Sequence, residues 1–148
     1  MTKNVFEILY TRIESEYNRY LETLQDVFVA HTVLMDFVEL ADAYFFDDKT
    51  LYLMHNKTKF SGEGVRDVTG QVLTSSEYLQ RLLTSTKRDE TLKVYYEKIV
   101  AERPKIKGKI TEEEFVSLFT TKQLCFVVGY IKEYKRYYIN SNKLEHRL

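Results

Sequence analysis

The chain has 148 residues, of which 44% are apolar and 30% charged, with 22 basic and 22 acidic side chains. This composition is typical of one globular domain with a hydrophobic core, and it excludes an intrinsically disordered chain. A lone cysteine, Cys125, excludes an intrachain disulfide and a thiolate metal cluster. No apolar run in the sequence approaches the roughly 20 residues of a membrane span, and the first residues lack a secretory signal. We therefore expect no membrane partner and a cytoplasmic location, in a host cell or a virion.

The first 61 residues contain neither Gly nor Pro, and they predict a long helical segment. Apolar residues recur at every seventh position, which is the pattern of one helix face. We expect helix over residues 4–46, either as one continuous rod or as a pair broken near residues 28–32, where β-branched and aromatic residues crowd. The positions of this stripe are Phe6, Ile13, Tyr20, Val27, Leu34 and Ala41.

The next segment is expected to be a small insertion. Residues 50–55 favour a strand, and the residues that follow favour a turn. Gly62-Glu63-Gly64 lacks the third glycine and the lysine of a phosphate-binding loop, so it indicates a flexible turn. A β-hairpin or an irregular loop across residues 50–74 fits this pattern.

Helical patterns return in the second half. Thr74 and Glu77 have the spacing of a capping box, and a further helix is expected over residues 89–102, where Pro104 ends it.

A second capping box at residues 111–114 predicts a long last helix to about residue 139, followed by a frayed tail over residues 140–148. The sequence as a whole predicts one domain over residues 1–148. Its fold class is mainly all-α: a helical bundle of four to five helices with the insertion around residues 50–74.

We find no motif for catalysis or metal binding. None of the three histidines follows an acidic residue by three positions, as a di-iron helix site requires. We interpret His31 as a core or boundary histidine, although Asp36 and Glu39 lie on later turns of the predicted helix. Cys125 is expected to be buried and structural. We therefore predict no enzyme, no metal and no cofactor; a buried cluster of His31 with acidic residues would support an enzyme instead.

Two features indicate a partner-binding surface. A loop over residues 103–109 carries four basic residues and no acid, which suits a phosphate or an acidic protein surface, although a plain solvated loop fits as well. Tyrosines mixed with Lys and Arg follow on the predicted last helix, where they fit a core face, a protein interface or a grip on single-stranded nucleic acid. The candidate residues are Arg103, Lys105, Lys107, Lys109, Tyr130, Tyr134, Lys135, Arg136, Tyr137 and Tyr138.

Charge is distributed unevenly along the chain. Residues 1–50 carry four basic and ten acidic side chains, and residues 51–148 carry 18 basic and 12 acidic. Such electrical polarity influences the choice of partner. An acidic face on the first predicted helix would suit the basic groove of an enzyme that handles nucleic acid.

The chain has twelve tyrosines, one proline and an apolar stripe from Phe6 to Phe45. In this general character it resembles the small Tyr-rich helical orphan proteins of archaeal viruses and other mobile elements. The resemblance implies a coat component or an inhibitor of a host machine. We therefore predict a non-enzymatic protein-binding module, an inhibitor or adaptor that docks on a host machine for nucleic acid, such as a polymerase or nuclease. A nucleic-acid-binding or virion coat protein is the alternative, and either role is compatible with a homo-oligomer.

Overall fold

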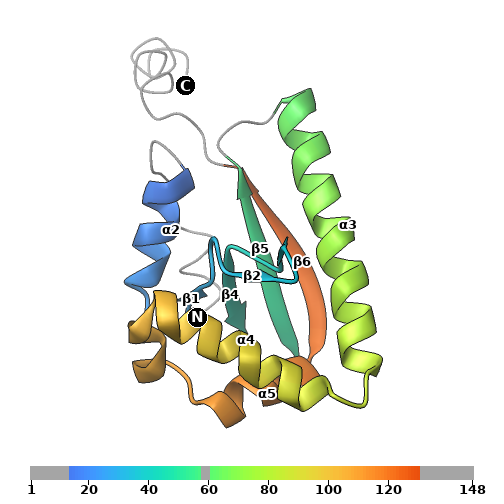
Figure 1. Ribbon diagram of the computed structural model, residues 1–148. Helices are drawn as coiled ribbons and strands as arrows, with labels where there is room; N and C mark the ends of the chain where they lie inside the picture. The colour runs from blue at the N-terminus through green and yellow to red at the C-terminus, as the bar shows by residue number, and fades with distance from the viewer. Residues whose placement is uncertain (1–13, 58–60, 131–148) are drawn as a thin grey trace.

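The computed structural model describes residues 14–57 and 61–130 of the chain (Figure 1). Four strands form one mixed sheet in the order β1-β4-β5-β6, and two further strands form a separate hairpin. This is an α/β fold, so the prediction of a mainly all-α helical bundle is wrong. The elements are α2 (Glu14–Glu22), β1 (Phe28–Val29), β2 (Leu34–Met35), β3 (Val38–Glu39), β4 (Ala43–Phe46), β5 (Thr50–Lys57), α3 (Gly62–Thr84), α4 (Arg88–Glu102), the 3-10 helix η1 (Pro104–Gly108), α5 (Glu112–Thr121) and β6 (Gln123–Tyr130).

Helices cover both faces of the four-stranded sheet (Figure 1). On one face, Leu21 of α2 packs in a cluster with Phe45 and Met54 of the central strands. On the other face, Tyr44 and Leu53 join the larger core, which α3, α4 and α5 complete. Strand β4 runs antiparallel to both of its neighbours, β1 and β5, whereas β6 runs parallel to β5. The central strands are therefore buried on both sides.

The expected helix over residues 4–46 is correct only for α2 among the described residues, and residues 1–13 lie outside them. The four consecutive residues 27–30 are all buried, because β1 is packed between α2 and the helices of the opposite face. A strand that is buried on both faces shows no alternation of polar and apolar residues. Its apolar spacing therefore fits a helix equally well, which explains the error.

The turns of this segment are made without glycine. Asp36 and Phe37 form a two-residue turn between Met35 and Val38, which pair across the β2–β3 hairpin. Their φ angles are 48° and 67°, as in a type I′ turn, and Thr32 also has a positive φ of 68°. The lack of Gly therefore did not indicate an unbroken helix.

The prediction of a small hairpin or irregular loop over residues 50–74 is also wrong, because residues 50–57 belong to strand β5 and residues 62–74 belong to helix α3. Its strand is confirmed, but that strand is β5, at the centre of the sheet. Helix α3 begins at Gly62, where the side chain of Ser61 accepts a hydrogen bond from the Gly64 N–H at 3.1 Å. Thr74 is therefore inside a helix, and its hydroxyl donates to the Gly70 carbonyl at 2.8 Å instead of capping a new one.

Predictions based on local signals hold better in the second half. The helix over residues 89–102 is confirmed as α4, and Pro104 opens η1 immediately after it. Thr111 caps α5, as its hydroxyl oxygen accepts the Glu114 N–H at 3.2 Å. The long last helix is nevertheless wrong beyond Thr121, because the chain continues as β6; residues 131–148 lie outside the described part.

Among the helices that the structure describes, we find none with both the length and the apolar character needed to cross a lipid bilayer.

Candidate functional site

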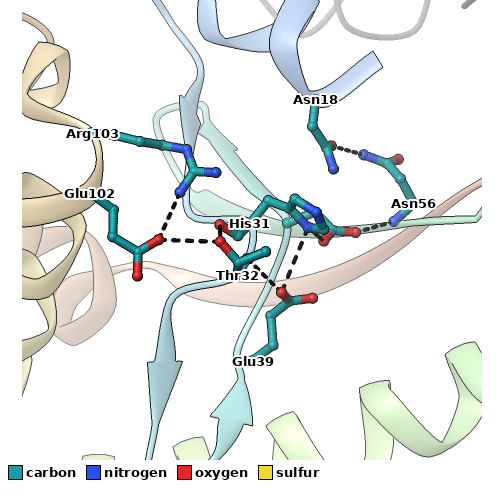
Figure 2. A network of polar contacts seen from close by, with 8 residues as sticks. Asn18, His31, Thr32, Glu39, Asn56, Glu102 and Arg103 are labelled. Carbon is teal, nitrogen blue, oxygen red and sulfur yellow. Dashed lines mark hydrogen bonds and ion pairs between the residues drawn. The ribbon is translucent and has the colours of Figure 1, made fainter. Parts of the chain in front are cut away.

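One segment that loops out of the sheet brings together a histidine and two carboxylates. His31 lies between β1 and β2, Glu39 ends β3, and Asp42 directly precedes β4. The His31 Nδ1 atom is 2.8 Å from Asp42 Oδ1 and 3.6 Å from Glu39 Oε2. One possible ligand atom from each residue lies within 4.8 Å of the other two. We call this group the His31 cluster, and Figure 2 shows it with its polar surroundings.

Asp42 is the buried member of the cluster, with 2% of its side chain exposed. Its N–H donates to the Met54 carbonyl at 2.8 Å, which extends the pairing of β4 with β5. Burial acts to raise the pKa of Asp42, but hydrogen bonds from His31 and from the Asn56 N–H outweigh it and hold this pKa below its ordinary value. Asp42 is therefore a fixed negative charge.

Glu39 is the proton-exchanging member. Burial, and next the negative charge of Asp42, raise the pKa of Glu39 to about 7. The Thr32 N–H donates to Glu39 Oε2 at 2.7 Å and offsets part of this rise. Glu39 therefore exchanges a proton near neutral pH.

A second set of contacts joins the cluster to α4. The Thr32 hydroxyl is 3.2 Å from Glu102 Oε2, and the Arg103 guanidinium lies 3.4 Å from the same oxygen (Figure 2). Thr32 thus connects the turn that holds Glu39 to the end of a helix on one face of the sheet. Arg103, a predicted partner-binding residue, is used here as a structural contact.

A second histidine lies beside the cluster. Met54 of β5 accepts the Asp42 N–H, and His55 is the next residue of β5, so His55 lies near Asp42, whose negative charge acts on its imidazole. His55 is fully buried, and within the described residues neither of its ring nitrogens makes a hydrogen bond of good geometry. Burial lowers the pKa of His55, which keeps its imidazole neutral.

A hollow of about 620 Å³ adjoins the cluster, between the β2–β3 hairpin and α3. Glu39 belongs to both, and the lining also includes Lys57 and Arg66. At its rim, Leu34 is 43% exposed, and Phe37 at the tip of the hairpin is 94% exposed. The hollow is thus bordered by balanced charges and by exposed apolar side chains.

The predicted basic loop does not form one cationic surface. The Lys109 ammonium donates to the carbonyls of Glu22 and Val27 at 2.5 and 2.7 Å, so this lysine joins α2 to the α5 side of the molecule. Of the four basic residues, Lys105 and Lys107 are exposed, whereas Arg103 and Lys109 are half-buried. Lys109 and Arg103 therefore make contacts within the protein, and their charges are not free for a partner in the way that the prediction assumed.

The predicted tyrosine-rich surface is described only at its start. Tyr130 ends β6 and is half-buried, so it lies on a strand and not on a helix. Cys125 on the same strand is exposed, which corrects the expectation of a buried cysteine. The other five candidates of this surface, Tyr134, Lys135, Arg136, Tyr137 and Tyr138, lie outside the described residues.

Sequence reasoning missed the His31 cluster because it placed the segment on a helix. Residues 31 and 42 would be about 16 Å apart along such a helix. Chain reversals at Thr32 and at the hairpin tip bring them into contact instead. The available signal was a histidine with three acids in the next eleven residues, which is weak without knowledge of the turns.

The fold and the site define a mixed-sheet α/β protein with a His-carboxylate cluster beside an open hollow. In comparisons with known proteins, no family model, no curated protein and no solved structure matches the chain.

Proposed function

We propose that this protein is a binding module that docks on a protein partner through the tip of the β2–β3 hairpin and the adjoining hollow. The observation that carries the proposal is Phe37, whose side chain is 94% exposed while its backbone has a φ of 67°. An exposed aromatic side chain is unfavourable in water, and a bulky residue is unfavourable in the left-handed region. Within the described part of the chain, packing around Phe37 offsets neither cost.

The tip is held rigidly, as an interface anchor should be. The Tyr78 hydroxyl donates to Asp36 at 2.8 Å, beside Phe37 in the turn. The Lys98 ammonium donates to the Leu34 carbonyl at 3.2 Å, at the base of the hairpin. A rigid anchor loses little conformational entropy on binding, which favours affinity.

The surroundings favour a protein over a nucleic acid as the partner at this surface. Aromatic anchors with a polar rim are typical of protein interfaces. Lys57 and Arg66 at the hollow are accompanied by Glu39 and Asp67, whereas a phosphate-binding surface needs an excess of positive charge. The balanced lining suits a partner with its own mixed charges.

The finer proposal is that the partner is a host machine that handles nucleic acid and that this protein is a viral or mobile-element inhibitor or adaptor. Its support is the charge asymmetry of the chain, with an acidic first third, because the grooves of such machines are basic. This proposal about the identity of the partner is independent of the proposal that docking occurs through the hairpin tip.

Affinity capture from the source organism, compared between the wild type and Phe37→Asn, tests the proposal. Asn accepts the left-handed backbone and lacks the aromatic ring, so the fold is kept while the anchor is removed. We expect at least one partner to be retained by the wild type and lost by the variant, with direct binding weakened at least about tenfold, as for an interface hot spot. Equal binding by the two proteins would refute docking through the hairpin.

A further inference from the structure

We propose that His31, Glu39 and Asp42 bind one divalent transition-metal ion, for which Zn²⁺ is the best-suited ion. An imidazole with two carboxylates is a donor set that Zn²⁺ and similar ions prefer, whereas Mg²⁺ and Ca²⁺ prefer oxygen alone. This inference is independent of the proposed docking at the hairpin tip.

The spacing of the donor atoms fits such an ion. Ligand atoms about 2.1 Å from a tetrahedral Zn²⁺ are about 3.4 Å from one another. The two separations from His31 Nδ1, 2.8 Å to Asp42 and 3.6 Å to Glu39, lie on either side of this value. All three atoms lie within 4.8 Å of one another, so side-chain rotations that shorten the longest separation bring them to bonding distance of one ion, which takes the place of any proton at Nδ1.

The two carboxylates of the cluster also favour the binding of a cation. Within the residues that the structure describes, neither Glu39 nor Asp42 forms an ion pair with Lys or Arg, and His31 is their one cationic neighbour in salt-bridge range. A divalent ion would compensate both carboxylates at once.

Backbone groups already orient the ligands. The Thr32 N–H donates to Glu39 at 2.7 Å, and the Asn56 N–H donates to Asp42 Oδ2 at 2.6 Å. Such contacts to the ligands are typical of metal sites, where they fix carboxylate orientation. Thr32 is β-branched and has a φ of 68°, an unfavourable conformation that is typical of functional positions.

The experiment uses the untagged full chain, treated with a chelator and desalted, and then titrated with ZnCl₂ by calorimetry and with CoCl₂ by visible absorption. We expect saturable binding of one ion per chain and, for Co²⁺, the visible bands that ligation by the protein produces. Melting temperature should rise with the Zn²⁺ concentration by mass action.

His31→Ala and Glu39→Gln are the test variants, since these side chains are 26% and 19% exposed and their replacement should leave the fold intact by circular dichroism. Each should lower the affinity at least about tenfold. Asp36→Asn is the matched control, an acidic residue of the same hairpin that contacts Tyr78 instead, and it should bind like the wild type. Absence of saturable binding to the wild type would overturn the site. Wild-type affinity in both His31→Ala and Glu39→Gln would overturn it as well. Phe37→Asn should keep its metal, so failure here is distinguishable from failure of the docking proposal.

Discussion

Replacement of Phe37 should stabilise the protein while it removes partner binding. Phe37 occupies the left-handed region with a φ of 67°, where a residue with a Cβ atom loses roughly 1–2 kcal/mol. Asn tolerates this region better than Phe, so Phe37→Asn should recover about 1 kcal/mol. Phe37→Gly should recover less, about 0.5 kcal/mol, because glycine also gains entropy in the unfolded chain.

Loss of packing does not offset this gain. Phe37 is 94% exposed, so only about 12 Å² of a side chain of roughly 200 Å² is covered, which contributes about 0.3 kcal/mol. The net effect therefore remains favourable for Phe37→Asn. For a domain of this size, 1 kcal/mol corresponds to a rise of about 2–4 °C in the melting temperature.

The assay is urea unfolding followed by circular dichroism, together with a thermal scan, on the wild type and three variants. Phe37→Ala is the third variant, because it removes the ring and keeps a Cβ atom in the strained backbone. We expect the stability of Phe37→Ala to stay within about 0.5 kcal/mol of the wild type. If Phe37→Asn and Phe37→Gly both lose more than 1 kcal/mol, the side chain packs within the protein, and the argument for an unsatisfied anchor fails.

Three further predictions concern the fold that holds the site. Tyr44 and Tyr95 share a buried hydrogen bond of 2.7 Å, so Tyr95→Phe should lower the free energy of unfolding by about 1–3 kcal/mol. The double variant Tyr44→Phe/Tyr95→Phe should lose less than the sum of the two single variants, and additive losses in urea unfolding would contradict the pairing. A Cβ atom at Gly129 would collide with the amide oxygen of Asn56, so Gly129→Ala should lose about 1–3 kcal/mol in the same assay, and an unchanged midpoint would show that this amide is free to move. Lys109→Met removes two hydrogen bonds to backbone carbonyls and should lower the free energy of unfolding by about 1–3 kcal/mol without changing salt-dependent nucleic-acid binding. Unchanged stability together with weaker nucleic-acid binding would show that this lysine belongs to a cationic binding surface.

Local sequence signals predicted the elements whose ends depend on neighbouring residues. Thr111 caps α5 with its own side chain, and Pro104 cannot continue α4 because it lacks an N–H. Both effects act within a few residues, so they are readable without the fold. The strand in residues 50–55 was likewise predicted from its β-prone composition and is part of β5.

The partner-binding surface was only partly predictable. A run of basic residues in the sequence suggested one patch, but Arg103 contacts Glu102 and Lys109 contacts two distant carbonyls. The direction of each side chain depends on what packs nearby, which a loop sequence does not encode locally. Phe37, in contrast, lies in a segment that was predicted to be helical, and the structure places it in the β2–β3 turn with 94% of its side chain exposed.

The sequence by itself determined that the chain has a hydrophobic core, where α4 begins and ends, and which residue caps α5, because composition and short-range hydrogen bonding decide these properties. Only the tertiary structure decided that residues 28–46 contribute strands β1 to β4 and that β6 extends the sheet, because β5 and β6 pair across more than sixty residues and both faces of β1 are covered by helices. The pairing of β4 with β1, together with the chain reversals between them, places Asp42 beside His31. A site of this kind follows from strand register and chain reversal, and no periodicity along one segment contains that information.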